Sequence, residues 1–280
     1  MSKLVLFGNS VNRLTGGGTW TDVLSDLGAK AQLTGLSMRG KPLPIVYEHV
    51  VSRSECSEQE LKEHLANSMS ALRPNQAHHR ALAVAGRRLL TSNYDYCFEL
   101  ADGGHSERAN LQSESTYSAY RRVKVGNRFI WHIHGELRAP RTIMLGLHQY
   151  AGYLQKLRGY LTSSKKESPF LAGSVDFEKS GEPFSWVDLF LRDNVHIAGL
   201  TMDYVELHLW WLIAFKLRIR RQACGATHFY HFKSARDGAG VARRLEMMSD
   251  IGVHVHEVVV RDGDWKGAHE RMFDKIAAAP

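Results

Sequence analysis

Short apolar runs that end at glycine or at polar residues recur along the chain. The first covers residues 3–7 and ends at Gly8, and the second covers residues 88–91 and is followed by a polar stretch. Runs of this length that are bounded by turn residues are typical of buried strands. The same pattern predicts further strands at residues 129–134, 142–145, 194–198, 227–232 and 253–260.

Helical patterns lie between these runs. Ser57 and Glu60 have the spacing of a capping box, Leu61 and Leu65 repeat at a helical interval, and Pro74 ends the pattern. Other helices are predicted to begin at Trp20 and to cover residues 77–85, 148–161, 203–221, 239–251 and 266–278. Residues 101–128 are expected to form a loop with a short strand or two, and residues 162–182 a long connection or lid.

Strands that alternate with helices indicate βαβ units and a parallel sheet. We therefore expect an α/β fold, namely a Rossmann-like, doubly wound parallel sheet with helices on both faces and a small helical or loop insertion. The expected core comprises residues 1–30, 85–150 and 190–280, with insertions at about 40–84 and 151–185. Ligands of such sheets bind at the carboxyl ends of the strands, so polar residues at those ends become the candidates for function.

Composition narrows the class of protein. With 280 residues, 44% hydrophobic and 23% charged, the chain resembles a soluble globular protein rather than a disordered or fibrous one. Cys56, Cys97 and Cys224 form no CxxC pair, so we expect neither a zinc module nor disulfides, and a cytoplasmic location. The net charge of +7 is spread over short clusters, and the apolar runs are too short for a membrane span. We therefore expect no nucleic-acid or membrane partner.

Four strand ends carry polar sets. A glycine at a strand end lets backbone N–H groups approach a phosphate closely. Taken singly, each set fits a tight turn or a helix N-cap equally well. In chain order, the sets are Gly8, Asn9, Ser10 and Asn12; Ser92, Asn93 and Asp95; His132, His134 and Gly135; and Gly199, Thr201 and Asp203.

The histidines raise the question of a metal. His132 and His134 are two residues apart on a predicted strand and so share a face. Two imidazoles on one face could bind a metal ion, yet the sequence offers no further ligands in an evident motif. His254 and His256 also share a face, without an acidic partner in register. A histidine before a strand-end glycine fits a structural role as readily as a catalytic one.

In this order and placement, the four sets resemble the sirtuin (SIR2) superfamily, and more narrowly the SIR2-like NAD-hydrolysing domains of bacterial anti-phage defence. Residues 7–13 with the helix of Trp20 are similar to the family's first glycine loop, and residues 91–95 to its T-x-N-[YI]-D motif. His134-Gly135 resembles its His-Gly segment, and residues 199–203 its late G-x-S/T-x-D loop. The resemblance covers nearly the whole chain as one domain.

The resemblance implies an NAD+ glycohydrolase that releases nicotinamide and ADP-ribose, uses NAD as its substrate and needs no metal. Asn93 would position the water or the nicotinamide ribose, and His134 would act as general base on a ribose hydroxyl. Asp95 would bind the nicotinamide amide or orient the site. The remaining NAD-binding positions that the resemblance implies are Gly8, Asn9, Ser10, Asn12, Ser92, Gly199, Thr201 and Asp203.

Departures from the protein-deacylating sirtuins bear on the activity. Three isolated cysteines cannot build their four-cysteine zinc module, and Ser92 replaces their glutamine before Asn93, as in the NAD-hydrolysing relatives. Three alternatives stay open: a protein deacylase or ADP-ribosyltransferase, a catalytically silent nucleotide-binding subunit, and a metal-dependent hydrolase that uses His132 and His134.

An NAD hydrolase must be gated, because uncontrolled loss of NAD would poison its host. The catalytic fold is expected to fill the chain and to leave no room for a sensor domain. We therefore expect activation by homo-oligomerisation or by a separate regulatory protein, with residues 162–182 and 218–221 as candidate contact surfaces.

Overall fold

A mixed sheet of eight strands runs through the part of the chain that the computed structural model describes, namely residues 2–104, 107–108, 116–163, 168–173, 176–179, 184–219, 224–235 and 237–279. The strand order is β3-β4-β5-β2-β1-β6-β7-β8. The bounds are β1 Lys3–Phe7, β2 Arg88–Thr91, β3 Glu107–Arg108, β4 Val123–Val125, β5 Arg128–His132, β6 Asn194–Ala198, β7 Thr227–Lys233 and β8 Val253–Val259.

The six strands from β5 to β8 in this order are parallel, and only β3 and β4 at one edge pair antiparallel. The chain order reverses at β1, which lies between β2 and β6. This is the topological switch point at which doubly wound sheets bind ligands. The expected α/β, Rossmann-like fold is therefore confirmed.

Strand alternation divides the core of the protein between the two faces of the sheet. Leu4 and Leu6 of β1 point into one hydrophobic cluster, and Val5 and Phe7 point into the other. Successive side chains of a strand alternate in this way, and the central strand is hydrophobic throughout because helices cover both of its faces.

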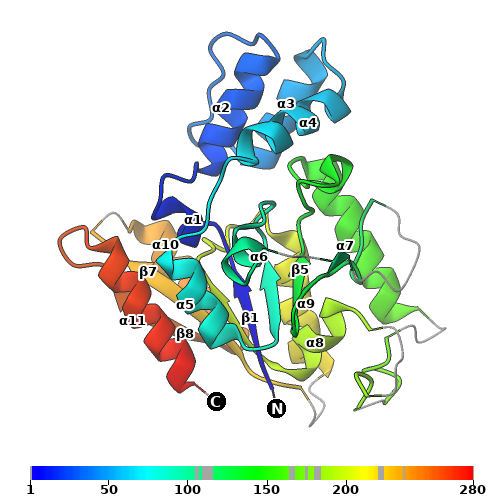
Figure 1. The fold of residues 1–280 in the computed structure, drawn as a ribbon, viewed down its shortest axis with the longest axis vertical. Coiled ribbons are helices and arrows are strands. Elements are labelled where there is room, and N and C mark those ends of the chain that lie inside the picture. Colours follow the sequence, from blue (N-terminus) through cyan, green and yellow to red (C-terminus); the bar gives the residue numbers. More distant parts are fainter. Residues whose placement is uncertain are drawn as a thin grey trace.

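Two groups of helices cover the sheet (Figure 1). The first cluster contains side chains of α7, α8, α9 and α10, and the second contains side chains of α5, α6 and α11. The bounds are α5 Gln76–Ala85, α6 Cys97–Ala101, α7 Leu147–Thr162, α8 Trp186–Arg192, α9 Leu207–Ile219, α10 Ala239–Asp250 and α11 Trp265–Ala278.

A helical module stands above the carboxyl ends of the strands in Figure 1. It consists of α2 (Trp20–Lys30), α3 (Leu43–Arg53) and α4 (Glu58–Met69), and α1 (Ser10–Arg13) connects it to β1. Capping boxes at Thr19 and Ser57 start α2 and α4. The module's own core also takes in Tyr94 and Leu145, which follow β2 and β5. The module therefore packs directly on the loops that carry the candidate site.

Several local expectations need correction. Residues 142–145 form no strand: Pro140–Thr142 is a 3₁₀ turn, and the residues after it pair with no strand among those described. The helix expected over 203–221 begins at Leu207, because residues 203–206 form a turn in which the Glu206 N–H donates to the Asp203 carbonyl. Helices α3, α6 and α8 were not predicted.

The other boundary expectations can be placed on the structure. Helix α2, within the expected core stretch 1–30, packs on α3 and α4, and α5, within the expected insertion 40–84, packs on the sheet. No described helix is long and apolar enough to cross a membrane. Residues 220–221 and much of 162–182, which we considered as contact surfaces, lie outside the described residues.

Candidate functional site

The carboxyl ends of β2 and β5 bring Asn93 and His134 together. The two strands are parallel neighbours, with Thr91 paired to His132, so Asn93 and His134 each lie two residues beyond a paired position. Asn93 is 5% exposed and His134 is 3% exposed. The two residues predicted to act in catalysis therefore lie at one edge of the sheet, in a buried environment.

His132 fixes the backbone beneath Asn93. Its Nδ1 lies 2.7 Å from the Asn93 carbonyl oxygen, and its Nε2 lies 2.8 Å from a carboxylate oxygen of Glu99. Both neighbours are acceptors, so both ring nitrogens must donate, which requires the imidazolium form. Burial alone lowers the pKa of His132, but the charge and hydrogen bond of Glu99, with the charge of Glu136, raise it to about 9.

The side-chain amide of Asn93 is free to bind a ligand. Its Nδ2 and Oδ1 are both buried, and neither has a hydrogen-bond partner among the described residues. Leaving such groups unpaired in the interior costs about 1–3 kcal/mol each. A buried carboxamide with two unused donors and an unused acceptor is therefore the clearest sign of a polar ligand at this edge of the sheet.

His134 faces two residues that the sequence analysis missed. Its Nε2 lies 3.0 Å from Nε2 of His208 and 3.4 Å from Oε2 of Glu206. Burial lowers the pKa of His134 to about 3, and burial followed by the nearby His134 lowers that of His208. Burial, followed by the charge of Asp203, raises the pKa of Glu206 to about 8. Burial thus favours the uncharged form of all three groups.

Aromatic side chains close this cluster from the side of α7. The Tyr150 ring lies 5.6 Å from the His134 ring, and the Tyr153 ring lies 5.4 Å from the His208 ring. Trp186 donates to the Tyr153 hydroxyl at 2.8 Å. These contacts hold His134 and His208 in an apolar surrounding, which accounts for the lowered pKa values of both imidazoles.

The first and last polar sets meet at the switch point. Gly8 donates to the Ala198 carbonyl at 2.9 Å, and Ser10 donates to the Gly199 carbonyl at 3.2 Å. A Cβ on Gly8 would lie 2.5 Å from the Gly199 carbonyl oxygen, so no larger residue fits there. This close approach of backbone to backbone explains why both strand ends carry glycine.

A hydrogen-bond relay connects the first loop to Asp95. The Asn75 N–H donates to Nδ1 of His78, so Nε2 of His78 carries the proton and donates to Asn12 Oδ1 at 2.8 Å. Asn12 then donates through Nδ2 to Asp95 at 2.7 Å and to the Asn9 side chain at 3.1 Å. This relay fixes the orientation of the Asn12 amide and of the Asp95 carboxylate.

The late loop contributes less than the sequence suggested. Thr201 and Asp203 are exposed, and the Asp203 carboxylate accepts from the N–H of Tyr204 instead of capping α9. Ser92 is half-buried, and its N–H donates to the Phe7 carbonyl. The structure thus joins the first set to Asp95 through Asn12 and places Asn93 and His134 on neighbouring strand ends. Among the described residues of the late loop, Gly199 contacts the first set directly, through the N–H of Ser10.

His132 and His134 do not form a common metal site. Both ring nitrogens of His132 are used by Asn93 and Glu99, whereas His134 turns to His208. The chemistry around His134 comes instead from residues at the start of α9. The one available signal for them was a glutamate and a histidine two residues apart, at the entry to an otherwise apolar helix.

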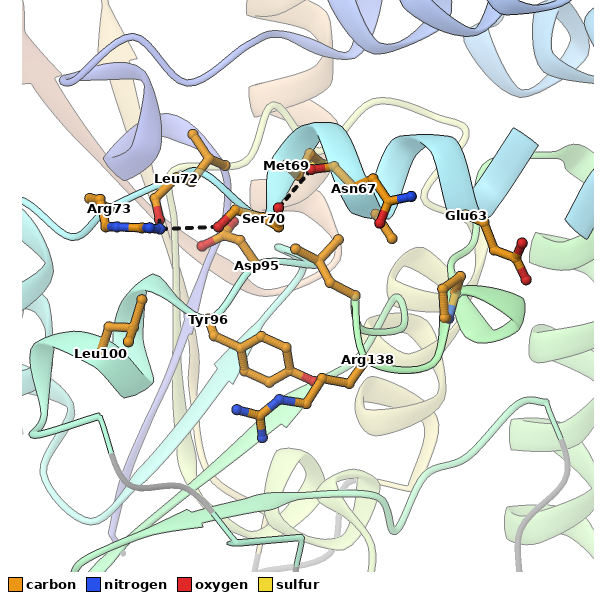
Figure 2. A pocket seen from close by; sticks show the side chains of 13 residues that line it. Glu63, Asn67, Met69, Ser70, Leu72, Arg73, Asp95, Tyr96, Leu100 and Arg138 are labelled. Carbon is orange, nitrogen blue, oxygen red and sulfur yellow. Dashed lines mark hydrogen bonds between the residues drawn. The ribbon is translucent and has the colours of Figure 1, made fainter. Parts of the chain in front are cut away.

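A cavity of about 750 Å³ lies beside the site, below the end of α4 (Figure 2). Asp95 and Tyr96 form part of its wall, and the guanidinium of Arg138 lies 4.4 Å from the Tyr96 ring. A space of this size suits a small organic ligand. Its other lining residues come from α4 and its C-terminal extension, α6 and the 3₁₀ turn: Glu63, Ala66, Asn67, Met69, Ser70, Leu72, Arg73, Leu100, Leu137 and Pro140.

Comparison with known proteins finds a family model that matches part of the chain. No curated protein matches the chain. Residues 87–178 match the family model of a SIR2-like domain. The matched segment runs from β2 through α7 and contains Asn93, Asp95 and His134. This part of the chain is therefore similar to a SIR2-like domain, and the Rossmann-like sheet agrees with that likeness.

Proposed function

We propose that this protein is an NAD+ glycohydrolase, with Asn93 and His134 as its catalytic residues. The observation that carries the proposal is the unpartnered, buried amide of Asn93 at the strand end next to that of the buried His134. A SIR2-like domain supplies the substrate class, because these domains use NAD. The absence of a four-cysteine module, with only three cysteines in the chain, favours hydrolysis over protein deacylation.

The proposed reaction breaks the bond between nicotinamide and ribose. The bonding electrons move to the nicotinamide nitrogen and cancel its positive charge, so the leaving group needs no acid. The ribose passes through an oxocarbenium-like state, and water adds to its anomeric carbon and loses one proton. Asn93 would hold the water or the ribose. His134 would accept a proton from a ribose hydroxyl as the bond breaks and return it to that oxygen after water has added. The products are nicotinamide, ADP-ribose and a proton.

Asp95 is the proposed contact for the nicotinamide amide. Its carboxylate is held by Asn12 and by the Cys97 N–H, and it reaches the wall of the 750 Å³ cavity. We propose that this cavity receives the nicotinamide end of the substrate or the released base (Figure 2). The dinucleotide phosphates would then lie towards Gly8, Asn9 and Ser10, near the switch point.

We also propose that the active protein is gated. His208 caps the base nitrogen of His134, and Asn93 is almost fully buried, so the site must open before substrate can enter. A homo-oligomer or a separate regulatory protein would stabilise the open state. A role in anti-phage defence, by NAD depletion, belongs to this proposal and derives from the resemblance of the four motif sets.

The test is a purified assay that follows NAD, nicotinamide and ADP-ribose while the chain concentration is varied. The proposal predicts equal release of the two products, and rising turnover per chain with concentration if self-association opens the site. His134→Ala should abolish turnover, whereas His64→Ala, a half-buried histidine of α4, should keep it. Binding of NAD without products at any concentration, with or without candidate partners, would favour the silent nucleotide-binding subunit.

A further inference from the structure

Three side chains with metal-binding atoms converge at the start of α9. The ligand atoms of His134, Glu206 and His208 all lie within 4.8 Å of one another. They come from two separate parts of the chain, since His134 follows β5, whereas Glu206 precedes α9 and His208 lies in its first turn. His208 is fully buried and His134 nearly so, which sets this group apart from acidic clusters on a protein surface.

We propose that His134, Glu206 and His208 form a binding site for Zn²⁺, and that the bound ion inhibits the enzyme by occupying its catalytic base. Two imidazoles and one carboxylate are a ligand set that zinc uses with a fourth, open position. The inhibitory part of this inference rests on the proposed function, whereas the metal site itself does not.

Two of the three distances between ligand atoms are close to those of a zinc site. Ligand atoms at about 2.0–2.1 Å from a tetrahedral ion lie roughly 3.3 Å from each other. His134 Nε2 and Glu206 Oε2 are already 3.4 Å apart, and the two Nε2 atoms are 3.0 Å apart. The two rings need to separate by about 0.3 Å, and the ligand atoms of Glu206 and His208, which lie within 4.8 Å of each other, need to reach about 3.3 Å.

The enclosure favours zinc over metals that need more ligands. Tyr150 packs on both imidazoles and Tyr153 packs on that of His208, so aromatic rings rather than polar side chains surround the ligand atoms. Iron(II) bound by two histidines and one carboxylate keeps several open positions. A four-coordinate ion with a single open position suits this enclosed site better.

Unpaired polar atoms provide a second, independent indication of a ligand. Glu206 Oε2 and His208 Nδ1 are both buried and have no hydrogen-bond partner in the described part of the chain. A bound ion would satisfy the carboxylate oxygen. His208 Nδ1 would still lack the second-shell acceptor that structural zinc sites provide, which weakens binding by about 10- to 100-fold. We therefore expect a reversible site with moderate affinity.

Occupancy would have a direct chemical consequence. The lone pair of His134 Nε2 that binds the ion is the one that would accept a proton from the ribose. A metal-bound imidazole can no longer act as a base, and the ion would also hold His208 against His134. Zinc would therefore oppose the opening of the site.

The binding test uses the metal alone on the full chain, freed of metal by dialysis against a chelator. We expect Zn²⁺ to bind with a stoichiometry of one in calorimetry, and Co²⁺ to give the visible absorption of a four-coordinate ion. Glu206→Gln keeps the shape of the side chain but removes the carboxylate that would bind the ion after losing its proton, and should weaken binding at least about tenfold. His208→Phe should do the same.

The matched control is His254→Gln, because His254 is an exposed histidine of β8 remote from the three ligands. It should bind Zn²⁺ as the wild type does. Equal affinity of the wild type and Glu206→Gln would overturn the site, as would an equal loss in His254→Gln. A circular dichroism spectrum of each variant shows whether the fold is retained. If Glu206→Gln or His208→Phe misfolds, the zinc affinity of the other variant tests the site.

Measuring NAD turnover with and without Zn²⁺ distinguishes failure of this inference from failure of the proposed function. If the chain hydrolyses NAD, saturating Zn²⁺ should lower turnover at least tenfold in the wild type, and a chelator should restore it. Hydrolysis that Zn²⁺ does not affect, in a chain that binds no Zn²⁺, would refute the metal site alone. Site-specific Zn²⁺ binding in a chain that never hydrolyses NAD would refute the proposed function and leave the metal site standing.

Discussion

The buried pair of His132 and Glu99 gives the most quantitative prediction. We expect Glu99→Gln, which preserves the shape of the side chain, to destabilise the protein most at acidic pH. His132 is a cation because both of its ring nitrogens donate to acceptors, and its folded pKa is about 9 against an unfolded value of about 6.5. Glutamine cannot compensate the buried charge, so this stabilisation is lost.

The magnitude follows from the pKa difference. A shift from 6.5 to about 9 corresponds to about 3 kcal/mol. Because the folded pKa is raised, this contribution is fully present below pH 6.5 and is lost as the pH rises through about 9. Glu99→Gln should therefore lower the free energy of unfolding by about 3 kcal/mol at pH 6, and the difference should shrink steadily towards pH 10.

Urea unfolding of the wild type and of Glu99→Gln at a series of pH values provides the assay. Glu246→Gln, an exposed glutamate of α10, is the matched control and should leave the unfolding free energy within about 0.5 kcal/mol of the wild type. A difference between Glu99→Gln and wild type that is the same at pH 6 and pH 10 would refute the ionic pairing of His132 and Glu99.

Two further predictions concern stability. Gly135→Ala should lower the free energy of unfolding by more than about 3 kcal/mol, because Gly135 has a φ of 98° and a Cβ there would lie 2.1 Å from a carbonyl oxygen. The control Gly159→Ala, on the exposed face of α7, should raise it by about 0.5–1 kcal/mol. Thermal or urea unfolding measures both. Burial, two neighbouring histidines and Lys216 lower the pKa of His228 to about 4. The free energy of unfolding of the wild type should therefore fall by about 1 kcal/mol or more between pH 6.5 and pH 4, and that of His228→Gln should fall less. An equal fall in both proteins, measured by urea unfolding, would contradict this.

Much of the fold follows from local patterns in the sequence. The buried strands around the switch point were predictable because helices cover both faces, which makes each strand a short apolar run. The capping box of Ser57 and Glu60 marked the start of α4 correctly. The error at residues 142–145 has a different cause. Residues 143–145 are an apolar run like a buried strand, but they follow the 3₁₀ turn Pro140–Thr142 and pair with no described strand.

The candidate site was predictable only in part, and the reason is geometric. Asn93 and His134 follow neighbouring strands, so the strand-end rule brings them together. Glu99 and His208 approach the site from helices whose packing no local pattern encodes. Lone buried histidines and glutamates look alike in sequence whether they bind a ligand or each other. Their roles emerge only from the distances and from the unpaired atoms around them.

The central claim is that this chain hydrolyses NAD with Asn93 in its active site. The most direct test measures NAD, nicotinamide and ADP-ribose in cells that express the wild type or Asn93→Ala at equal levels. The account predicts loss of NAD, with nicotinamide and ADP-ribose rising together, in the wild type under activating conditions, and unchanged NAD with Asn93→Ala. NAD loss of equal size in both strains would contradict it.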